Sequence, residues 1–272
     1  MKAKNKPIMT LQPFCASCIL KVFSTETEYS LGISEKAARR TAELAKYLAR
    51  NFSLDVSQYG KWAWELDAMA KNGARDPYKK LKDMENKKAG ALAAKLSPRN
   101  LEEALLFALA GNSLDFGHIS PEKAFGVLAH DLKAKPVIDD RKRAAELINK
   151  HAHITYIIDN CGEIYFDKLL IEMLVRMGKK LTIVVRSRPF INDATLEDIK
   201  KAGIASLADK IVEFNGIGYM KTKGLVLAKG QAAFITMANY QAPAIYLLKV
   251  KCRCIARNLQ VPEMSTVAMV VE

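Results

Sequence analysis

Side chains with oxygen donors follow two stretches of the chain that are predicted to be β-strands. Asp159 and Asn160 come directly after the β-branched run 153–158, and Asp193 follows the apolar run 181–185. Carboxylate and amide oxygens suit Mg²⁺, Mn²⁺ and similar cations, and such sites leave coordination positions open for water and phosphate. The residue types therefore indicate a divalent metal site, provided that the two turns lie side by side.

Positive groups and a helix start accompany these oxygens. Arg186 ends the second run, and Lys229 follows a further apolar run at 224–228. Both cations could neutralise phosphate charge, and Gly162 begins a predicted helix whose free N–H groups could hold an anion. A divalent ion, cations and a helix N-terminus together favour phosphoryl transfer to water.

Each of these features also has a structural interpretation. An Asp-Asn pair after a strand is often a turn, and Asp193 before a helix is a candidate N-cap. A lysine after a strand is often only solvated. The histidines offer no alternative zinc site, because their positions show no ligand spacing. The co-occurrence of polar groups at successive strand ends is what favours a functional site.

The elements that must position these residues change character near residue 153. From there to the C-terminus, β-branched runs alternate with helical patterns, which predicts βαβ units and a mostly parallel sheet. The carboxyl ends of such strands meet at one edge, where ligands bind. The preceding part reads as helices, with strong patterns at 34–52, 76–96, 101–112, 120–132 and 139–151. We expect a helical portion over 1–150 and an α/β domain over 151–272, which could share one core.

Composition narrows the functional class. The net charge of +13 attracts anions such as phosphorylated small molecules, nucleic acid or acidic lipid. No block of like charges or nucleic-acid motif is present, so nucleic-acid binding is disfavoured. No run of 18 uncharged apolar residues predicts a membrane span, and no membrane partner is expected.

The cysteines are sparse and odd in number, which argues against a disulfide scaffold and favours a reducing cytoplasm. Cys15-x-x-Cys18 is half of a metal or redox motif, and simple packing is the third interpretation. Cys252 and Cys254 are separated by one residue only, so they do not repeat that spacing.

Several blocks resemble one family along almost the whole chain. They are PFCASCIL, DPYKKLKDMEN, AGNSLDFG, IIDNCGEIYFDKLLIEML, RPFINDATLED, LAKGQ and YLLKVKC followed by IARNLQVP. With them the sequence resembles the metal-dependent damage-control phosphatases, also called domain of unknown function 89, in its CxxC-containing type. The resemblance implies a helical N-terminal portion and a Rossmann-like three-layer α/β/α domain.

The resemblance also implies an activity. Its metal would be cobalt, nickel, manganese or magnesium, held by Asp159, Asn160 and Asp193. Its substrates would be phosphate monoesters of small metabolites, such as damaged or surplus sugar phosphates and phosphopantetheine-like compounds. Attack on phosphorus would come either from an aspartate, Asp159 or Asp193, or from a metal-bound water that Glu163 could orient.

The resemblance further implies a wall that binds substrate. The matching positions are Asn112, Asp115, Arg186 and Lys229. Arg186-Ser187 stands where the family usually has Lys-Gly, and an arginine fork is not equivalent to an ammonium. Ala233 and Ile235 stand where an amide and a carboxylate are usual, and the segment before LAKGQ is short.

These departures leave two alternatives to an active phosphatase. One is a catalytically weakened relative that binds a phosphorylated metabolite or a protein partner. The other is a carboxyl methyltransferase using S-adenosylmethionine, although no GxGxxG opens a helix after the first strand.

Overall fold

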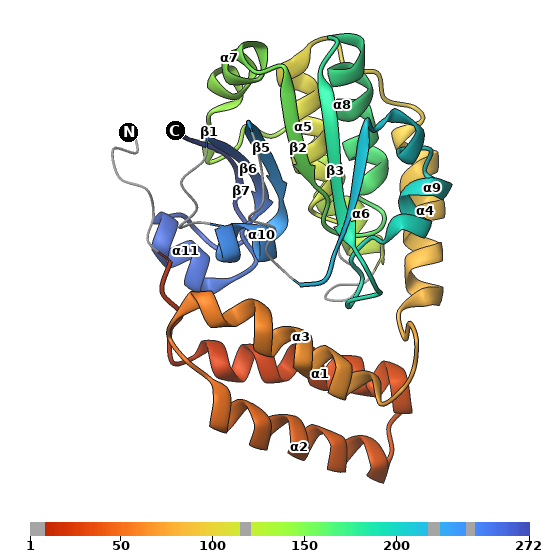
Figure 1. The fold of residues 1–272 in the computed structure, drawn as a ribbon, viewed down its shortest axis with the longest axis vertical. Coiled ribbons are helices and arrows are strands. Elements are labelled where there is room, and N and C mark those ends of the chain that lie inside the picture. Colours follow the sequence, from red (N-terminus) through yellow and green to blue (C-terminus); the bar gives the residue numbers. More distant parts are fainter. Residues whose placement is uncertain (1–8, 115–120, 217–223, 238–242) are drawn as a thin grey trace.

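The described residues form a seven-stranded sheet with helices on both faces (Figure 1). The structure, a computed structural model, describes residues 9–114, 121–216, 224–237 and 243–272. The strands are β1 (Ile138–Asp139), β2 (His153–Ile157), β3 (Lys180–Arg186), β4 (Lys210–Phe214), β5 (Leu225–Lys229), β6 (Ala244–Lys249) and β7 (Thr266–Val271). Their order is β1-β7-β6-β5-β2-β3-β4.

The helices comprise eleven α-helices and two short 3₁₀ turns within the described residues. They are α1 (Cys15–Leu31), α2 (Glu35–Asn51), η1 (Val56–Gln58), α3 (Tyr59–Lys71), α4 (Lys79–Ala93), α5 (Leu101–Gly111), α6 (Pro121–Asp131), α7 (Arg141–Lys150), α8 (Ile164–Arg176), α9 (Leu196–Lys201), η2 (Ala205–Leu207), α10 (Gly230–Met237) and α11 (Arg253–Leu259).

Strand side chains point alternately into two apolar cores. On one face of β2, Ile154 and Tyr156 pack with α5, α7 and α8. On the opposite face, Ile157 packs in a core shared with α1, α3 and α10. A parallel sheet buried on both faces explains why its strands read as continuous apolar runs.

The helices α1, α2 and α3 pack against one another at the edge of the sheet where α10 and α11 begin (Figure 1). Ser34 caps α2 by accepting a hydrogen bond from the Ala37 amide, and Leu44 and Leu48 bury its apolar side. The amphipathic pattern thus places a helical layer beside the carboxyl ends of the strands.

The predicted fold class is confirmed: the protein has an α/β architecture with a mostly parallel sheet. The exception is β7, which runs antiparallel to β6 and carries the short β1 at its outer edge. The division of the chain at residue 150 stays a prediction. No described helix combines the length and apolar character needed to cross a bilayer.

Candidate functional site

Two loops that leave neighbouring strands meet at the carboxyl edge of the sheet. β2 and β3 pair in parallel, and beyond their ends Asn160 and Asp193 form an antiparallel β-bridge. The Ala194 amide also donates to the Asp159 carbonyl over 2.8 Å. The backbone therefore brings together the three residues that sequence analysis selected as oxygen donors.

Asp159 is buried and held in one orientation. Its Oδ2 accepts hydrogen bonds from the side-chain amides of Asn112 and Asn160, each over 3.1 Å. Asn112 is itself fixed, because its Oδ1 accepts from the Lys249 amide over 2.8 Å. Asn112, which was predicted to line the site, follows the end of α5 and is held by the end of β6. It thus fixes the position of the Asp159 carboxylate.

The backbone of Gly230 packs directly against the Asp159 carboxylate. It follows β5 with a φ of 75°, a left-handed conformation that glycine adopts at little cost. A Cβ atom built on it would lie 1.6 Å from Oδ2 of Asp159. The backbone approaches so closely that only glycine fits beside Asp159.

Glu163 braces the same loop. Its Oε2 accepts from the Asn112 side chain over 2.7 Å, and its Oε1 accepts from the Asn160 amide over 2.9 Å. Both oxygens are therefore engaged in positioning neighbours. The suggestion that Glu163 orients a water stays a prediction.

Lys229 is completely buried among carboxylates. Its ammonium donates to Oδ1 of Asp167 over 2.7 Å and lies 3.7 Å from Oε2 of Glu163. The Tyr156 hydroxyl donates to the same Asp167 oxygen over 2.8 Å. Burial raises the pKa of Asp167 to about 6, and Lys229 opposes that rise. Lys229 thus lies inside the site, anchored by α8.

Arg186 faces the second loop. Its Nε donates to Oδ2 of Asp193 over 2.6 Å, and a terminal nitrogen donates to the Gly216 carbonyl over 2.6 Å. Burial raises the pKa of Asp193, and the Arg186 guanidinium counteracts part of that effect. Arg186 therefore pairs with a proposed metal ligand.

Burial also raises the pKa of Asp159 well above its usual value, and the neighbouring carboxylates of Glu163 and Asp193 raise it further. The cations of Arg186 and Lys229 lower it in part. A group of buried carboxylates of this kind gains most from an additional cation.

The donor atoms fit a divalent cation in chemistry. The hydrogen bonds described above use Oδ2 of Asp159, Nδ2 of Asn160 and Oδ2 of Asp193, which makes Oδ1 of each side chain the candidate donor to a metal ion. Hard oxygens of this type suit magnesium and manganese. Across the described residues, no three cysteine, histidine, aspartate or glutamate side chains form a metal-holding group. The proposed set differs from such a group because its third donor is an amide.

Comparisons with known proteins identify the family of the chain. The family model described as the damage-control phosphatase ARMT1-like domain matches residues 12–267. The chain belongs to this phosphatase family. A damage-control phosphatase from Archaeoglobus fulgidus is 29% identical over 97% of the chain and all of the relative. Another from Pyrococcus horikoshii is 34% identical over 96% of the chain and 98% of the relative.

A solved structure extends the match to three dimensions. The crystal structure of a domain-of-unknown-function-89 protein from Pyrococcus horikoshii matches with a TM-score of 0.83 and 28% identity. The match includes 96% of this chain and 99% of the chain in that structure. Phosphatase activity is accordingly the activity of this family member, as the resemblance predicted.

The structure contradicts the interpretation of the loop residues as helix N-caps. Helix α9 is capped by Thr195, which forms a capping box with Asp198, so Asp193 is not its N-cap. Helix α8 begins at Ile164 without a side-chain cap. The Gly162 amide, expected to hold an anion, donates to Oδ1 of Asn86 over 2.8 Å instead. Asp115 lies outside the described residues.

The family departures on α10 have a packing role. Ala233 and Ile235 are buried in the apolar core beside α1 and α3. Between them, Phe234 makes an edge-to-face contact with Tyr246, with ring centroids 5.3 Å apart. Both positions therefore contribute to the apolar core.

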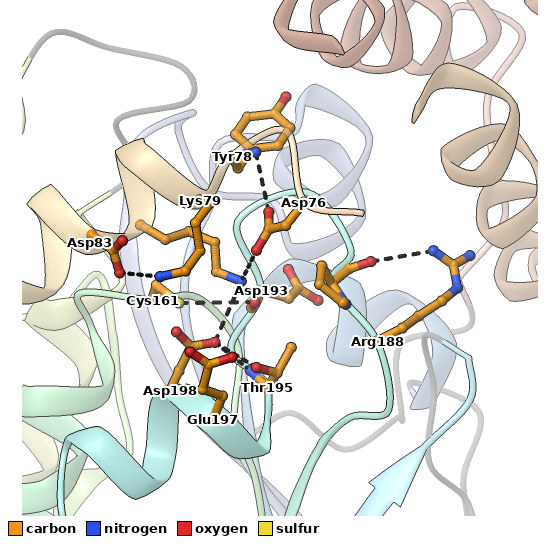
Figure 2. A network of polar contacts seen from close by, with 12 residues as sticks. Asp76, Tyr78, Lys79, Asp83, Cys161, Arg188, Asp193, Thr195, Glu197 and Asp198 are labelled. Atoms are coloured by element: carbon orange, nitrogen blue, oxygen red, sulfur yellow. Dashed lines mark hydrogen bonds and ion pairs between the residues drawn. The ribbon is translucent and has the colours of Figure 1, made fainter. Parts of the chain in front are cut away.

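A cavity of about 530 Å³ lies beside the loop that carries Asp193. Figure 2 shows polar contacts among the residues that line it, such as Asp76, Thr195 and Asp198. Lys82 lines this cavity, and its ammonium lies 3.1 Å from the Asp76 carboxylate and 3.4 Å from the Asp198 carboxylate. Its four cations face four carboxylates, so its charges largely neutralise one another. Its lining includes none of the three oxygen donors, and we therefore assign the chemistry to the strand-end cluster.

Sequence reasoning did not find three residues that shape the site. Gly230, Asp167 and Tyr156 each contact a predicted site residue. Gly230 had a detectable signal, because it directly follows a strand and precedes a helix. Asp167 and Tyr156 read as ordinary helix and strand positions, since their partners lie elsewhere in the chain.

Proposed function

We propose that this protein is a divalent-metal-dependent phosphomonoesterase acting on small phosphorylated metabolites. The observation that carries the proposal is an imbalance of buried charge at the strand ends. Four buried carboxylates belong to the described cluster, against two buried cations. They are Asp159, Glu163, Asp167 and Asp193, with Lys229 and Arg186. When all four carboxylates are ionised, two negative charges are in excess, and one divalent cation would balance them and favour that ionised state.

The three available oxygens suggest which residues hold the ion. Asp159, Asn160 and Asp193 would hold it, and the ion would supply charge stabilisation to the phosphoryl group in the transition state. Manganese, magnesium, cobalt and nickel are the candidates. The rigid hydrogen bonds around Asp159 would keep its carboxylate oriented without reorganisation.

The cations support a phosphate-ester substrate. Lys229 and Arg186 would raise the local positive potential where phosphate oxygens lie, and Asn112 would help to fix the same wall. Sugar phosphates and phosphopantetheine-like compounds are the proposed substrates, because the positive net charge of +13 also favours anionic ligands.

The test is metal-dependent hydrolysis of p-nitrophenyl phosphate and of several sugar phosphates. The protein is stripped with a chelator and reloaded separately with each of the four candidate metals. The Asp159→Asn variant keeps the side-chain volume and removes one negative charge. We expect its kcat/KM to fall by about 1000-fold, which corresponds to roughly 4 kcal/mol of transition-state stabilisation.

The matched control is Asp55→Asn, which makes the same substitution at an exposed cap of η1. It should keep the activity of the unmodified protein. Unchanged metal-dependent turnover in Asp159→Asn contradicts the proposal.

A further inference from the structure

Four of the five cysteines lie in two pairs that are far apart in the sequence. Cys15 begins α1 and Cys18 follows one turn later, whereas Cys252 caps α11 and Cys254 lies in its first turn. We call these four residues the cysteine cluster. None of them forms a disulfide in the structure.

Hydrogen bonds bring the two pairs together. The Cys254 thiol donates to the Thr10 carbonyl over 3.4 Å, and the Gln12 amide donates to Sγ of Cys15 over 3.3 Å. The Cys15 and Cys254 thiols also lie close enough to influence each other electrostatically. The segment that enters α1 thus lies directly against α11, as Figure 1 shows.

Packing around Phe14 fixes this arrangement. The guanidinium groups of Arg253 and Arg257 lie over its ring, each 5.2 Å from the centroid. Cys15 and Cys254 are buried beside it in the apolar core, whereas Cys18 is exposed. The cluster therefore extends from the core to the surface, where an ion can enter.

The thiols influence one another electrostatically. Burial raises the pKa of Cys254 to about 12, with Cys15 adding to the rise. Burial also raises the pKa of Cys252, and both Cys15 and Cys18 raise it further. Deprotonating several such thiols is unfavourable unless a cation joins them, and a soft divalent ion supplies that charge.

We propose that the cysteine cluster is a zinc site with four thiolate ligands, separate from the oxygen site. Four cysteines give a tetrahedral structural zinc site with Zn–S distances of about 2.3 Å. Thiolates select zinc over magnesium or manganese. In the described structure the four sulfurs are not gathered around one point. Exposed Cys18 and half-buried Cys252 would turn toward the other two on binding.

A zinc ion bound by these cysteines would link α1 to the start of α11, close to the phosphatase site. The Cys252 amide donates to Oε1 of Gln231 over 2.7 Å. Gln231 follows Gly230, whose backbone lies against Asp159. Zinc binding by Cys252 would therefore stabilise the start of α10, and with it the Gly230 backbone that lies against Asp159.

The experiment uses the full chain, purified under reducing, oxygen-free conditions and loaded with Co²⁺ as a spectroscopic substitute for zinc. We expect a sulfur-to-cobalt charge-transfer band and the intense visible bands of tetrahedral cobalt, at about one thiolate-bound ion per chain in addition to any cobalt held at the oxygen site. Zinc should displace the cobalt and abolish the bands. Both signals should disappear in the Cys252→Ser/Cys254→Ser variant.

Two controls separate this proposal from the proposed phosphatase mechanism. Cys161→Ala removes the fifth cysteine, and Asp159→Asn alters the oxygen site; both should keep the thiolate bands. If the double variant does not fold, Cys18→Ser changes an exposed side chain and should weaken cobalt affinity at least about 10-fold. Absence of a thiolate band in the unmodified chain overturns the proposal. So does a band that persists in the double variant, or a Cys15–Cys254 disulfide that forms in place of metal binding.

Discussion

Replacing Gly230 by alanine tests whether the orientation of Asp159 determines activity. The new Cβ would start 1.6 Å from Oδ2 of Asp159, and Cβ contacts below 3.0 Å essentially never occur. The carboxylate oxygen or the backbone must therefore move by about 1.4 Å, the difference between these two distances. Oδ2 would then lose its contacts with Asn112 and Asn160, which are 3.1 Å long.

The expected magnitude has two parts. Gly230 has a φ of 75°, which is a left-handed conformation. Such a conformation costs a non-glycine residue about 1–2 kcal/mol of stability. A displacement of about 1 Å at reacting groups lowers the rate about 100-fold. We therefore expect Gly230→Ala to lose about 100-fold or more in kcat/KM, with a moderate loss of stability.

Gly178→Ala is the matched control. Gly178 follows α8 with a φ of 74°, and a Cβ built there meets no atom within 4 Å. It carries the same backbone strain without the clash, so it should lose about 1–2 kcal/mol of unfolding free energy and keep its activity. Unfolding in urea and hydrolysis of p-nitrophenyl phosphate measure the two effects. Equal activity in both variants would refute the assignment of Asp159 to the reacting site.

Two further predictions concern buried charges. Lys229→Met leaves Asp167 and Glu163 without their ammonium, and should lower the free energy of unfolding in urea by about 3–5 kcal/mol; adding Asp167→Asn should restore part of it. Glu26 is buried, and within the described part of the chain its oxygens accept no hydrogen bond. Burial and then Asp67 raise its pKa to about 9, although the Lys71 ammonium 3.8 Å away opposes the rise. Above pH 4.5 its ionisation stabilises the unfolded chain, so stability falls as pH rises toward 9. Glu26→Gln removes this titration, and its stability relative to the unmodified protein should rise by up to about 4 kcal/mol between pH 5 and pH 8. A constant difference between the two proteins across this range contradicts the explanation.

Much of the architecture follows from local pattern. The runs that became β2 and β3 are apolar on both faces, and both end in polar loops. Since parallel strands share a carboxyl edge, the meeting of Asp159 and Asp193 could be predicted without knowing a single contact. Predictions held where the physical cause lies within a few residues of the chain.

Contacts between distant segments could not be predicted in this way. Asn86 takes up the Gly162 amide from another helix, which removes the anion site expected there. Cys15 meets Cys254 although the spacings of the two cysteine pairs differ. Spacing rules describe residues on one element, whereas a site assembled from two chain segments depends on the tertiary packing of both.

The N-terminal helices have a role in positioning the site as well as in forming the core. Lys71, at the end of α3, donates to the Pro189 carbonyl over 2.5 Å, and Arg188 lies 3.8 Å from the Trp64 ring centroid. These contacts fasten the loop that carries Asp193, four residues beyond Pro189. If the cysteine cluster fastens the same layer to the opposite side of the sheet, helices and strands are joined on both sides of the oxygen donors. Substitutions in α1 or α3 should then change the position of Asp193 without contacting it.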